Sequence, residues 1–257
     1  TYDVFSVNRD GTGLTNLTDT LAPSSEGGPE WSPDGQWIAF YSRNDLSSTT
    51  AIELMRHDGS ERHQVITIKA SAPSLSWSPD GAELAFSSDD GCGETGIYTD
   101  QEICLVRVDG TGLRRLTNSP GADVMPSWSP DGSRILYLGR AGDSSGVVSM
   151  RPDGSDQQLL AQYGHNAMWS PDGSHIAYDC EISTGTGGWY GSLRLMDHDG
   201  ANKTAPADSQ NTFNYTWSPD GQRITFSVSG TEPALFSFRL ADGIQSMIIE
   251  EAVSYPS

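Results

Sequence analysis

The sequence is poor in lysine and cysteine and has no long apolar run. Its 15 basic residues, of which only Lys69 and Lys203 are lysines, stand against 34 acidic residues, which gives a formal net charge of −19. Such a charge repels nucleic-acid phosphates and anionic membrane surfaces. No stretch approaches the roughly 18 apolar residues that span a bilayer, and residues 1–5 lack the basic and apolar regions of a signal peptide. We therefore expect neither nucleic-acid binding nor membrane insertion.

The excess of acidic residues is compatible with several interpretations. A cationic partner, a divalent metal and a salty or extracellular setting would each favour an acidic surface. A simple requirement for solubility would favour it equally. Composition alone does not distinguish among them.

Three cysteines are too few for a disulfide scaffold. Cys92 and Cys104 bracket a polar insertion, residues 93–103, where a disulfide would pin a flexible loop and imply an oxidising compartment. Two free thiols are the alternative. Cys180 has no partner in either case.

The most informative pattern is a repeat. The pentapeptide Trp-Ser-Pro-Asp-Gly occurs five times, at spacings of 46, 51, 41 and 48 residues. The copies begin at Trp31, Trp77, Trp128, Trp169 and Trp217. A period of about 40 to 50 residues is typical of solenoids, propellers and arrays, whose units are too small to bury their own apolar faces. Long helical periodicity is absent, so the repeat is built of strands.

Each repeat predicts two β-hairpins. After the motif Trp, Pro presets φ and Gly supplies positive φ, so the chain turns tightly into a short apolar strand such as residues 38–40. A second hairpin closes at an Asp-Gly pair, which is a strong hairpin signal. The Asp-Gly pairs begin at Asp10, Asp58, Asp109, Asp153, Asp199 and Asp242. The predicted fold class is all-β, a β-propeller of four-stranded antiparallel blades.

The series of Trp-Ser-Pro-Asp-Gly, Ile-Ala-Phe and Asp-Gly motifs resembles the PD40 repeats of TolB-like β-propellers, over nearly the whole chain. The resemblance implies a ring of blades. It leaves the function open, because PD40 propellers include periplasmic scaffolds, domains attached to serine peptidases and lyases of pectin fragments.

The repeat counts predict a six-bladed propeller whose last blade is composite or incomplete. Six Asp-Gly hairpins accompany five Trp hairpins, and we expect a single domain over 1–257 with a partial blade from 1–18 and 252–257. One explanation is a longer polypeptide interrupted inside a blade, and the other is a composite blade of three strands. Either leaves an open strand edge, which could accept a strand from another chain.

The variable connections between hairpins are the expected binding face, because binding residues concentrate on loops held by a rigid scaffold. The connection densest in carboxylates holds the candidate metal ligands Asp89, Asp90, Glu94 and Asp100. Oxygen ligands with glycine flexibility suit calcium, although the regular spacing of an EF-hand is missing. A solvated acidic loop is the alternative.

Residues four or five positions before each motif Trp should approach the mouth of a central channel. They include Glu26, Asp123, His165 and Phe213. This mixed set could hold a metal or a ligand, or could simply line a water-filled channel. Trp189 and Tyr190, in a Gly-rich insertion, could stack on a sugar or grip a peptide, or cover a blade edge.

The repeated motif residues themselves are interpreted as structural. The motif Asp side chains are expected to accept local backbone hydrogen bonds in turns, and the motif Trp side chains to pack between blades. No Gly-x-Ser-x-Gly elbow and no second α/β domain is present to carry a hydrolytic triad.

We therefore predict a non-catalytic, periplasmic or extracellular binding scaffold whose acidic variable face binds a protein or another cationic partner. One alternative is a lyase or hydrolase acting on a saccharide at the channel mouth. Another is an assembly subunit that associates with itself through the open blade edge.

Overall fold

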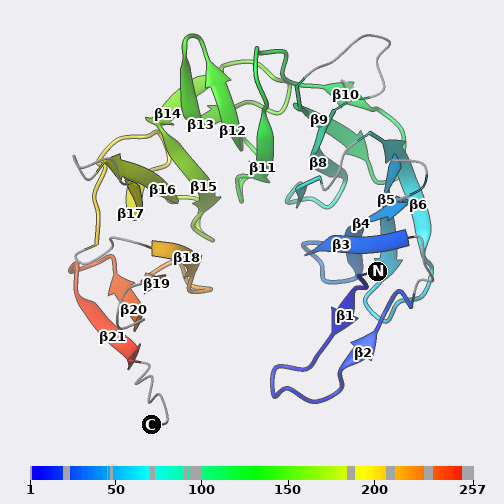
Figure 1. The fold of residues 1–257 in the computed structure, drawn as a ribbon, viewed down its shortest axis with the longest axis horizontal. Coiled ribbons are helices and arrows are strands. Elements are labelled where there is room, and N and C mark those ends of the chain that lie inside the picture. Colours follow the sequence, from blue (N-terminus) through cyan, green and yellow to red (C-terminus); the bar gives the residue numbers. More distant parts are fainter. Residues whose placement is uncertain are drawn as a thin grey trace. The chain divides into compact units, whose positions relative to one another are not determined.

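The structure is a computed structural model, shown as a ribbon in Figure 1. It describes residues 2–19, 24–44, 46, 49–69, 73–89, 92, 100–183, 189–206, 212–228 and 234–250. These residues form strands and turns, and none of them is helical. The chain divides into two compact units, Thr1–Asp143 with Ser149–Gln158, and Ser144–Val148 with Leu159–Ser257. Each unit is described by itself.

The first unit begins with a two-stranded sheet and continues with complete antiparallel meanders (Figure 1). Strands β1 (Phe5–Ser6) and β2 (Thr15–Asn16) form the short sheet. The next sheet has the order β3 (Ser24–Trp31), β4 (Trp37–Asn44), β5 (Thr49–Arg56) and β6 (His63–Ile68). The following sheet contains β7 (Leu75–Trp77), β8 (Glu83–Ser88), β9 (Glu102–Arg107) and β10 (Arg114–Arg115).

A further four-stranded sheet has strands that belong partly to each unit. Its order is β11 (Val124–Trp128), β12 (Ile135–Ala141), β13 (Ser144–Met150) and β14 (Gln158–Gln162). Strands β11 and β12 lie wholly in the first unit, whereas β13 and β14 cross its boundary.

The second unit contains two more antiparallel sheets. One is three-stranded, with β15 (Gly164–Trp169), β16 (His175–Ser183) and β17 (Trp189–Asp197). A single bridge between Leu195 and Thr204 lies where a fourth strand would follow. The other sheet contains β18 (Thr212–Trp217), β19 (Arg223–Val228), β20 (Ala234–Arg239) and β21 (Gln245–Glu250). The predicted all-β fold of four-stranded antiparallel blades is confirmed, and the number of six blades stays a prediction.

The motif turns form for local reasons that repeat from blade to blade. In the first copy, Asp34 Oδ1 accepts hydrogen bonds from the Ser32 hydroxyl at 2.6 Å and from the Gln36 N–H at 3.0 Å. The Ser32 hydroxyl in turn accepts from the Trp37 N–H, and Gly35 has φ of +66°. The same bonds recur in the other four copies. The interpretation of the motif aspartates as turn residues is therefore confirmed.

The motif tryptophans do not all pack alike. Trp77 is 9 % exposed, packs with Ile52 and Leu54 of the preceding sheet, and donates from Nε1 to the Glu30 carbonyl at 3.0 Å. Trp31 is 55 % exposed, so the prediction that it is a buried plug is wrong. Among the described residues, the sheet before it in the chain is the two-stranded sheet of β1 and β2, and Val4, just before β1, packs with Ile38 and Phe40.

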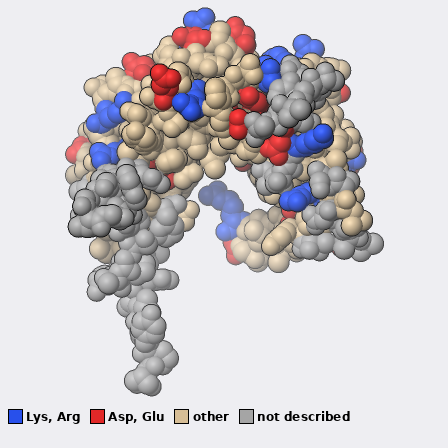
Figure 2. Space-filling model, turned by 45° about the horizontal axis from the view of Figure 1, so that its top comes forward, with Lys and Arg blue, Asp and Glu red and all other residues tan. Residues whose placement is uncertain are grey.

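Acidic and basic side chains are interspersed on the face drawn in Figure 2. Asp and Glu side chains there lie beside Arg and Lys side chains, and the coloured residues show no single continuous acidic field. Several acidic residues are committed to motif turns, where they accept backbone hydrogen bonds. The net charge therefore overstates how many carboxylates are available to a partner.

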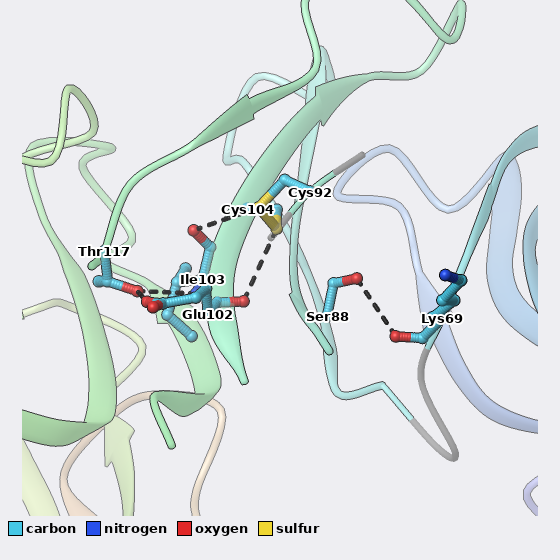
Figure 3. Close-up of a disulfide and its surroundings, with 7 residues drawn as sticks. All are labelled: Lys69, Ser88, Cys92, Glu102, Ile103, Cys104 and Thr117. Atoms are coloured by element: carbon cyan, nitrogen blue, oxygen red, sulfur yellow. Dashed lines mark hydrogen bonds between the residues drawn. A yellow bond between two sulfur atoms is a disulfide. The ribbon is translucent and has the colours of Figure 1, made fainter. Parts of the chain in front are cut away.

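Cys92 and Cys104 form a disulfide (Figure 3), with their Cα atoms 5.8 Å apart. Cys104 lies on β9 and is paired with Phe86 of β8, so the bond ties the chain after β8 to the centre of its sheet. Both cysteines are buried. Of the two alternatives for this pair, the structure contains the disulfide, and Cys180 is half-buried and takes no part in a disulfide.

Candidate functional site

Four carboxylates are buried among the described residues, and we call them the buried carboxylates. They are Glu26, Glu102, Asp123 and Asp179. Glu26 on β3 and Asp123 just before β11 are two of the four residues predicted to approach a channel mouth. Both are almost inaccessible, at 2 % and 0 % exposure. A buried carboxylate is costly unless it is hydrogen-bonded or paired, so each environment is informative.

Glu26 is only partly satisfied. Its Oε1 accepts from the Ser42 hydroxyl at 3.0 Å and from Arg62 Nη2 at 3.4 Å. Its Oε2 has no hydrogen-bond partner among the described protein groups. Arg62 is shared with Glu53, to which its Nε donates. One basic residue thus serves two carboxylates, and the Glu26 side chain keeps an open acceptor.

Asp123 is held by a close set of backbone and hydroxyl donors. The Ser119 hydroxyl lies 2.9 Å and 3.0 Å from its two oxygens, and the Arg140 N–H donates to Oδ1 at 3.1 Å. Gly139 allows this approach, because a Cβ there would collide with the Asp123 carboxylate and the Tyr137 ring. Burial raises the pKa of Asp123, and these hydrogen bonds only partly oppose the effect.

Glu102 lies on β9, beside the disulfide (Figure 3). Its Oε2 accepts from the Thr117 hydroxyl at 2.6 Å, and that hydroxyl accepts from the Ile103 N–H at 2.9 Å. Burial raises the pKa of Glu102, and the charge of Asp123 adds to the rise. Burial together with both carboxylates raises the pKa of Tyr137, whose buried Oη has no partner among the described protein groups.

Asp179, the fourth buried carboxylate, belongs to the second unit. It lies on β16 opposite His165 of β15 and is 8 % exposed. Its Oδ2 accepts from Asn166 Nδ2 at 2.8 Å, whereas Oδ1 has no partner in the described part of the chain. Burial raises the pKa of Asp179, opposed by the Asn166 bond and the nearby His165. The Tyr215 hydroxyl donates to the Asn166 carbonyl, at the register shift within β15.

The comparisons with known proteins decide the family. The family described as PD40, the TolB beta propeller domain, matches residues 1–187. The chain belongs to the PD40 family of TolB β-propellers. The protein named "Protein TolB homolog" of Chlorobium luteolum is 30 % identical over 138 residues, covering 53 % of this chain and 28 % of that protein. The PD40 chain therefore spans less than a third of that relative.

Solved propellers share the fold of this PD40 chain. TolB from Acinetobacter baumannii superposes with a TM-score of 0.70 at 19 % identity, covering 96 % of this chain and 59 % of that one. An oligogalacturonate lyase in complex with manganese superposes with a TM-score of 0.73 at 14 % identity, covering 99 % and 72 %. At these identities the likeness shows the fold alone.

For the predicted aromatic site residues of the PD40 propeller, the structure describes the strand but not the side chain. Phe213 lies in β18, and its side chain is outside the described part. Trp189 and Tyr190 begin β17, where they pair with Ser183 and Ile182 of β16, and their role in binding stays a prediction. Backbone pairing between β16 and β17 is continuous from His175 and Asp197 to Ser183 and Trp189.

The predicted calcium loop is described only at its ends. Asp89 is exposed, and its N–H donates to the Lys69 carbonyl at 2.7 Å. Asp100 is half-buried and accepts from the Gly121 N–H at 3.2 Å. Asp90 and Glu94 lie outside the described residues. Where the chain is described, no group of three or more His, Cys, Asp or Glu side chains has metal-binding geometry, and no helix has the length and apolar character of a membrane span.

Sequence reasoning missed Glu102, Tyr137 and Asp179. Glu102 had a signal, because it opens an otherwise apolar strand, residues 102–106, in which a charge is out of place. Tyr137 and Asp179 follow apolar residues of ordinary blade strands. Their roles depend on neighbours from other strands, which one repeat aligned on its Trp does not reveal.

The raised pKa values of Glu102 and Asp123 predict a pH dependence of stability. The folded state holds these protons more tightly than the unfolded state, so the stabilisation is full below the ordinary values of 4.5 and 3.8 and is lost as pH rises through the folded pKa values. In urea unfolding, the double variant E102Q/D123N should gain stability relative to the parent protein as pH rises from about 4 to about 7. A difference that does not change with pH would contradict this.

Asp172 provides a control of opposite sign. Hydrogen bonds from the Ser170 hydroxyl and the Ser174 N–H lower its pKa to about 2. Its stabilisation is present above its ordinary value of 3.8 and is lost as pH falls through the folded pKa. The D172N variant should therefore be less stable than the parent by a constant amount above about pH 5, and this difference should shrink as pH falls below about 4.

Proposed function

We propose that this PD40 propeller is an extracytoplasmic scaffold that binds a basic protein partner, with negative charge from its buried carboxylates contributing to recognition. The observation that carries the proposal is the pair of unsatisfied carboxylate oxygens, Glu26 Oε2 and Asp179 Oδ1. Unpaired acceptors of this kind destabilise a fold, and natural proteins keep such violations mainly at functional sites. Both oxygens are buried, so a cationic partner would be attracted to their negative charge through space and not by direct contact.

The location outside the cytoplasm is supported by the disulfide between Cys92 and Cys104. Structural disulfides persist in oxidising compartments and are rare in reducing ones. The similarity to a TolB homologue points the same way. The proposed partner is a protein because this chain belongs to the family of TolB β-propellers, whose members include periplasmic scaffolds.

Capture from an extracytoplasmic protein fraction tests this function. The immobilised chain should retain a partner at low salt and lose it at high salt, because the attraction between these carboxylates and the partner's charges crosses solvent, where it is screened within about 10 Å at 0.1 M salt. The E26Q/D179N variant should retain about tenfold less of the same partner, since the attraction exerted by two negative charges is lost.

A matched control removes two charges elsewhere. Asp153 and Asp220 each accept local turn bonds through Oδ1, which an asparagine can preserve. D153N/D220N has the same net charge as E26Q/D179N and should retain the partner like the parent. Equal losses of captured partner in both variants would show that binding depends on net charge alone. Turnover of oligogalacturonate, with or without manganese, would instead support the saccharide enzyme.

Self-association is a second candidate, favoured by one surface. Among the described residues β1 pairs only with β2, and both Phe5 of β1 and Trp31 of β3 are more than half exposed. An open strand edge beside exposed aromatic side chains is a template for another strand. Sedimentation should then show concentration-dependent dimers that W31S weakens. A monomer at every concentration would remove this candidate.

A further inference from the structure

A pocket of about 580 Å³ lies at the turn ends of two neighbouring sheets of the first unit, β3–β6 and β7–β10. This volume is within the range of about 300–1,000 Å³ that is usual for ligand sites. Its apolar walls are Pro33, Trp37, Leu54, Trp77, Pro79 and Val108. The carboxylates Asp34, Asp80 and Asp109 and the imidazole of His63 complete the lining. None of the buried carboxylates takes part, so this is a separate site.

One departure from the repeat accompanies the pocket. Six residues after the motif Trp, the first copy has Trp37, whereas the later copies have Glu83, Arg134, His175 and Arg223. Glu83 pairs with Arg114 at 2.7 Å, and Arg134 with Asp156 at 2.8 Å. In the second and third copies this position is therefore occupied by a side chain that forms an ion pair within its blade. In the first copy it is occupied by an indole.

Trp37 is held by two neighbours from its own sheet. The Arg56 guanidinium carbon lies 4.1 Å from the ring centroid, and the His63 ring meets the indole edge-on at 5.5 Å. Arg56 also pairs with Glu61 at 3.2 Å, which offsets its charge. His63 Nδ1 lies 2.8 Å from the Glu61 carbonyl, which orients the imidazole. The indole is thus fixed while remaining part of the pocket wall.

Each rim carboxylate is anchored through one oxygen. Asp34 Oδ1 and Asp80 Oδ1 accept their turn bonds from a serine hydroxyl at 2.6 Å and a backbone N–H at 3.0 Å. Asp109 Oδ1 accepts from both donors of Thr111. These hydrogen bonds lower the pKa of all three, so they are ionised at neutral pH. Oδ2 of each is left to an incoming donor.

We propose that this pocket binds an arginine side chain of a partner polypeptide. The aliphatic stem would pack on the proline and leucine walls, and the planar guanidinium would stack on indole and donate to the rim carboxylates. Lysine offers a point charge without the planar fork, so it should bind less tightly. A saccharide could stack on Trp37 but would leave the negative rim unused. Charge complementarity therefore favours the arginine.

The test uses the acetylated, amidated tripeptide Gly-Arg-Gly and its citrulline analogue, a neutral molecule of nearly the same shape. The Trp37 indole N–H signal in a two-dimensional NMR spectrum should shift on titration with Gly-Arg-Gly, and the shift should give a dissociation constant of about 1 mM. The citrulline analogue should bind about fivefold less tightly. Equal binding of the two peptides, no shift at all, or tighter binding of cellobiose would overturn the proposal.

Matched variants locate the effect. D80N keeps the Oδ1 acceptor of its turn but removes the rim charge. W37L keeps an apolar wall but removes the indole, so its binding is followed by the indole N–H signal of Trp77, which also lines the pocket. Each variant should weaken Gly-Arg-Gly binding about threefold to fivefold. D131N, at the same turn position in another blade, and W31L, an exposed Trp outside the pocket, should leave it unchanged. If D131N lost as much Gly-Arg-Gly affinity as D80N, the effect of Asp80 would not be local to the pocket.

The arginine pocket and the proposed scaffold function can be tested independently of each other. The E26Q/D179N variant should bind Gly-Arg-Gly like the parent, because neither residue lines the pocket. Weakened tripeptide binding in that variant would contradict an independent site. Retained tripeptide binding with no captured protein would reject the proposed function and leave the arginine pocket standing.

Discussion

Replacing Gly139 with alanine should destabilise the first unit by about 2–3 kcal/mol, the usual cost of overpacking a close-packed core. Gly139 lies on β12, and a Cβ at this position would come within 2.6 Å of Tyr137 Cε2 and closer still to the Asp123 carboxylate. Neither neighbour can move away without losing hydrogen bonds or packing contacts. Asp123 is fixed by Ser119 and by the Arg140 N–H, and Tyr137 is buried. A urea midpoint, with the transition slope compared between variants, measures the effect.

A double-mutant cycle separates collision from a general loss of strand structure. In a D123A background the added methyl group meets one fewer obstacle, so the cost of G139A should fall by about 1 kcal/mol or more, the size of coupling expected between residues in contact. Additive effects would show that Gly139 is needed for another reason. Circular dichroism of the folded baselines confirms that the sheets persist in each variant.

Removing the disulfide should cost about 3 kcal/mol, because Cys92 and Cys104 are separated by 12 residues and the bond restricts the unfolded chain. The paired substitution C92S/C104S is expected to lower the urea midpoint, and reduction of the parent protein should have a similar effect. C180S serves as the control, since Cys180 takes no part in the disulfide. A reducing agent that destabilises the C92S/C104S variant as strongly as the parent would contradict this assignment.

The fold could be predicted from the sequence because its determinants are local. The Ser-Pro-Asp-Gly turn is completed by bonds between residues two to five positions apart, such as Ser32, Asp34 and Trp37. Five copies of the same local solution indicate the same hairpin five times. The Asp-Gly turns behave alike, with Asp58 accepting from the Ser60 N–H. Local chemistry of this kind is readable without knowing which blades adjoin.

The candidate site was less predictable because it depends on neighbours distant in sequence. Alignment on the motif Trp placed Glu26 and Asp123 at equivalent positions, but it could not show that both would be buried. Glu102 reaches Thr117, which is 15 residues away, and Tyr137 responds to both Glu102 and Asp123. These contacts follow from strand pairing and packing together.

Differences between repeats were more informative than the repeat itself. Trp37 occupies a position that carries a charged or titratable side chain in the other copies, and that single change accompanies the pocket. Trp31 has the motif's sequence but an exposed side chain, because burial depends on the neighbouring sheet. Position within a repeat therefore predicts backbone structure better than side-chain function.

The central claim is that a basic partner is recognised through negative charge held at Glu26 and Asp179. The most direct measurement is the dissociation constant of the captured partner, by calorimetry, for the parent chain, E26Q/D179N and D153N/D220N at about 50 mM and about 500 mM salt. The account predicts an affinity at low salt that E26Q/D179N reduces about tenfold and the control does not, with a smaller gap between them at high salt. Equal affinities for the parent and E26Q/D179N at low salt would contradict it.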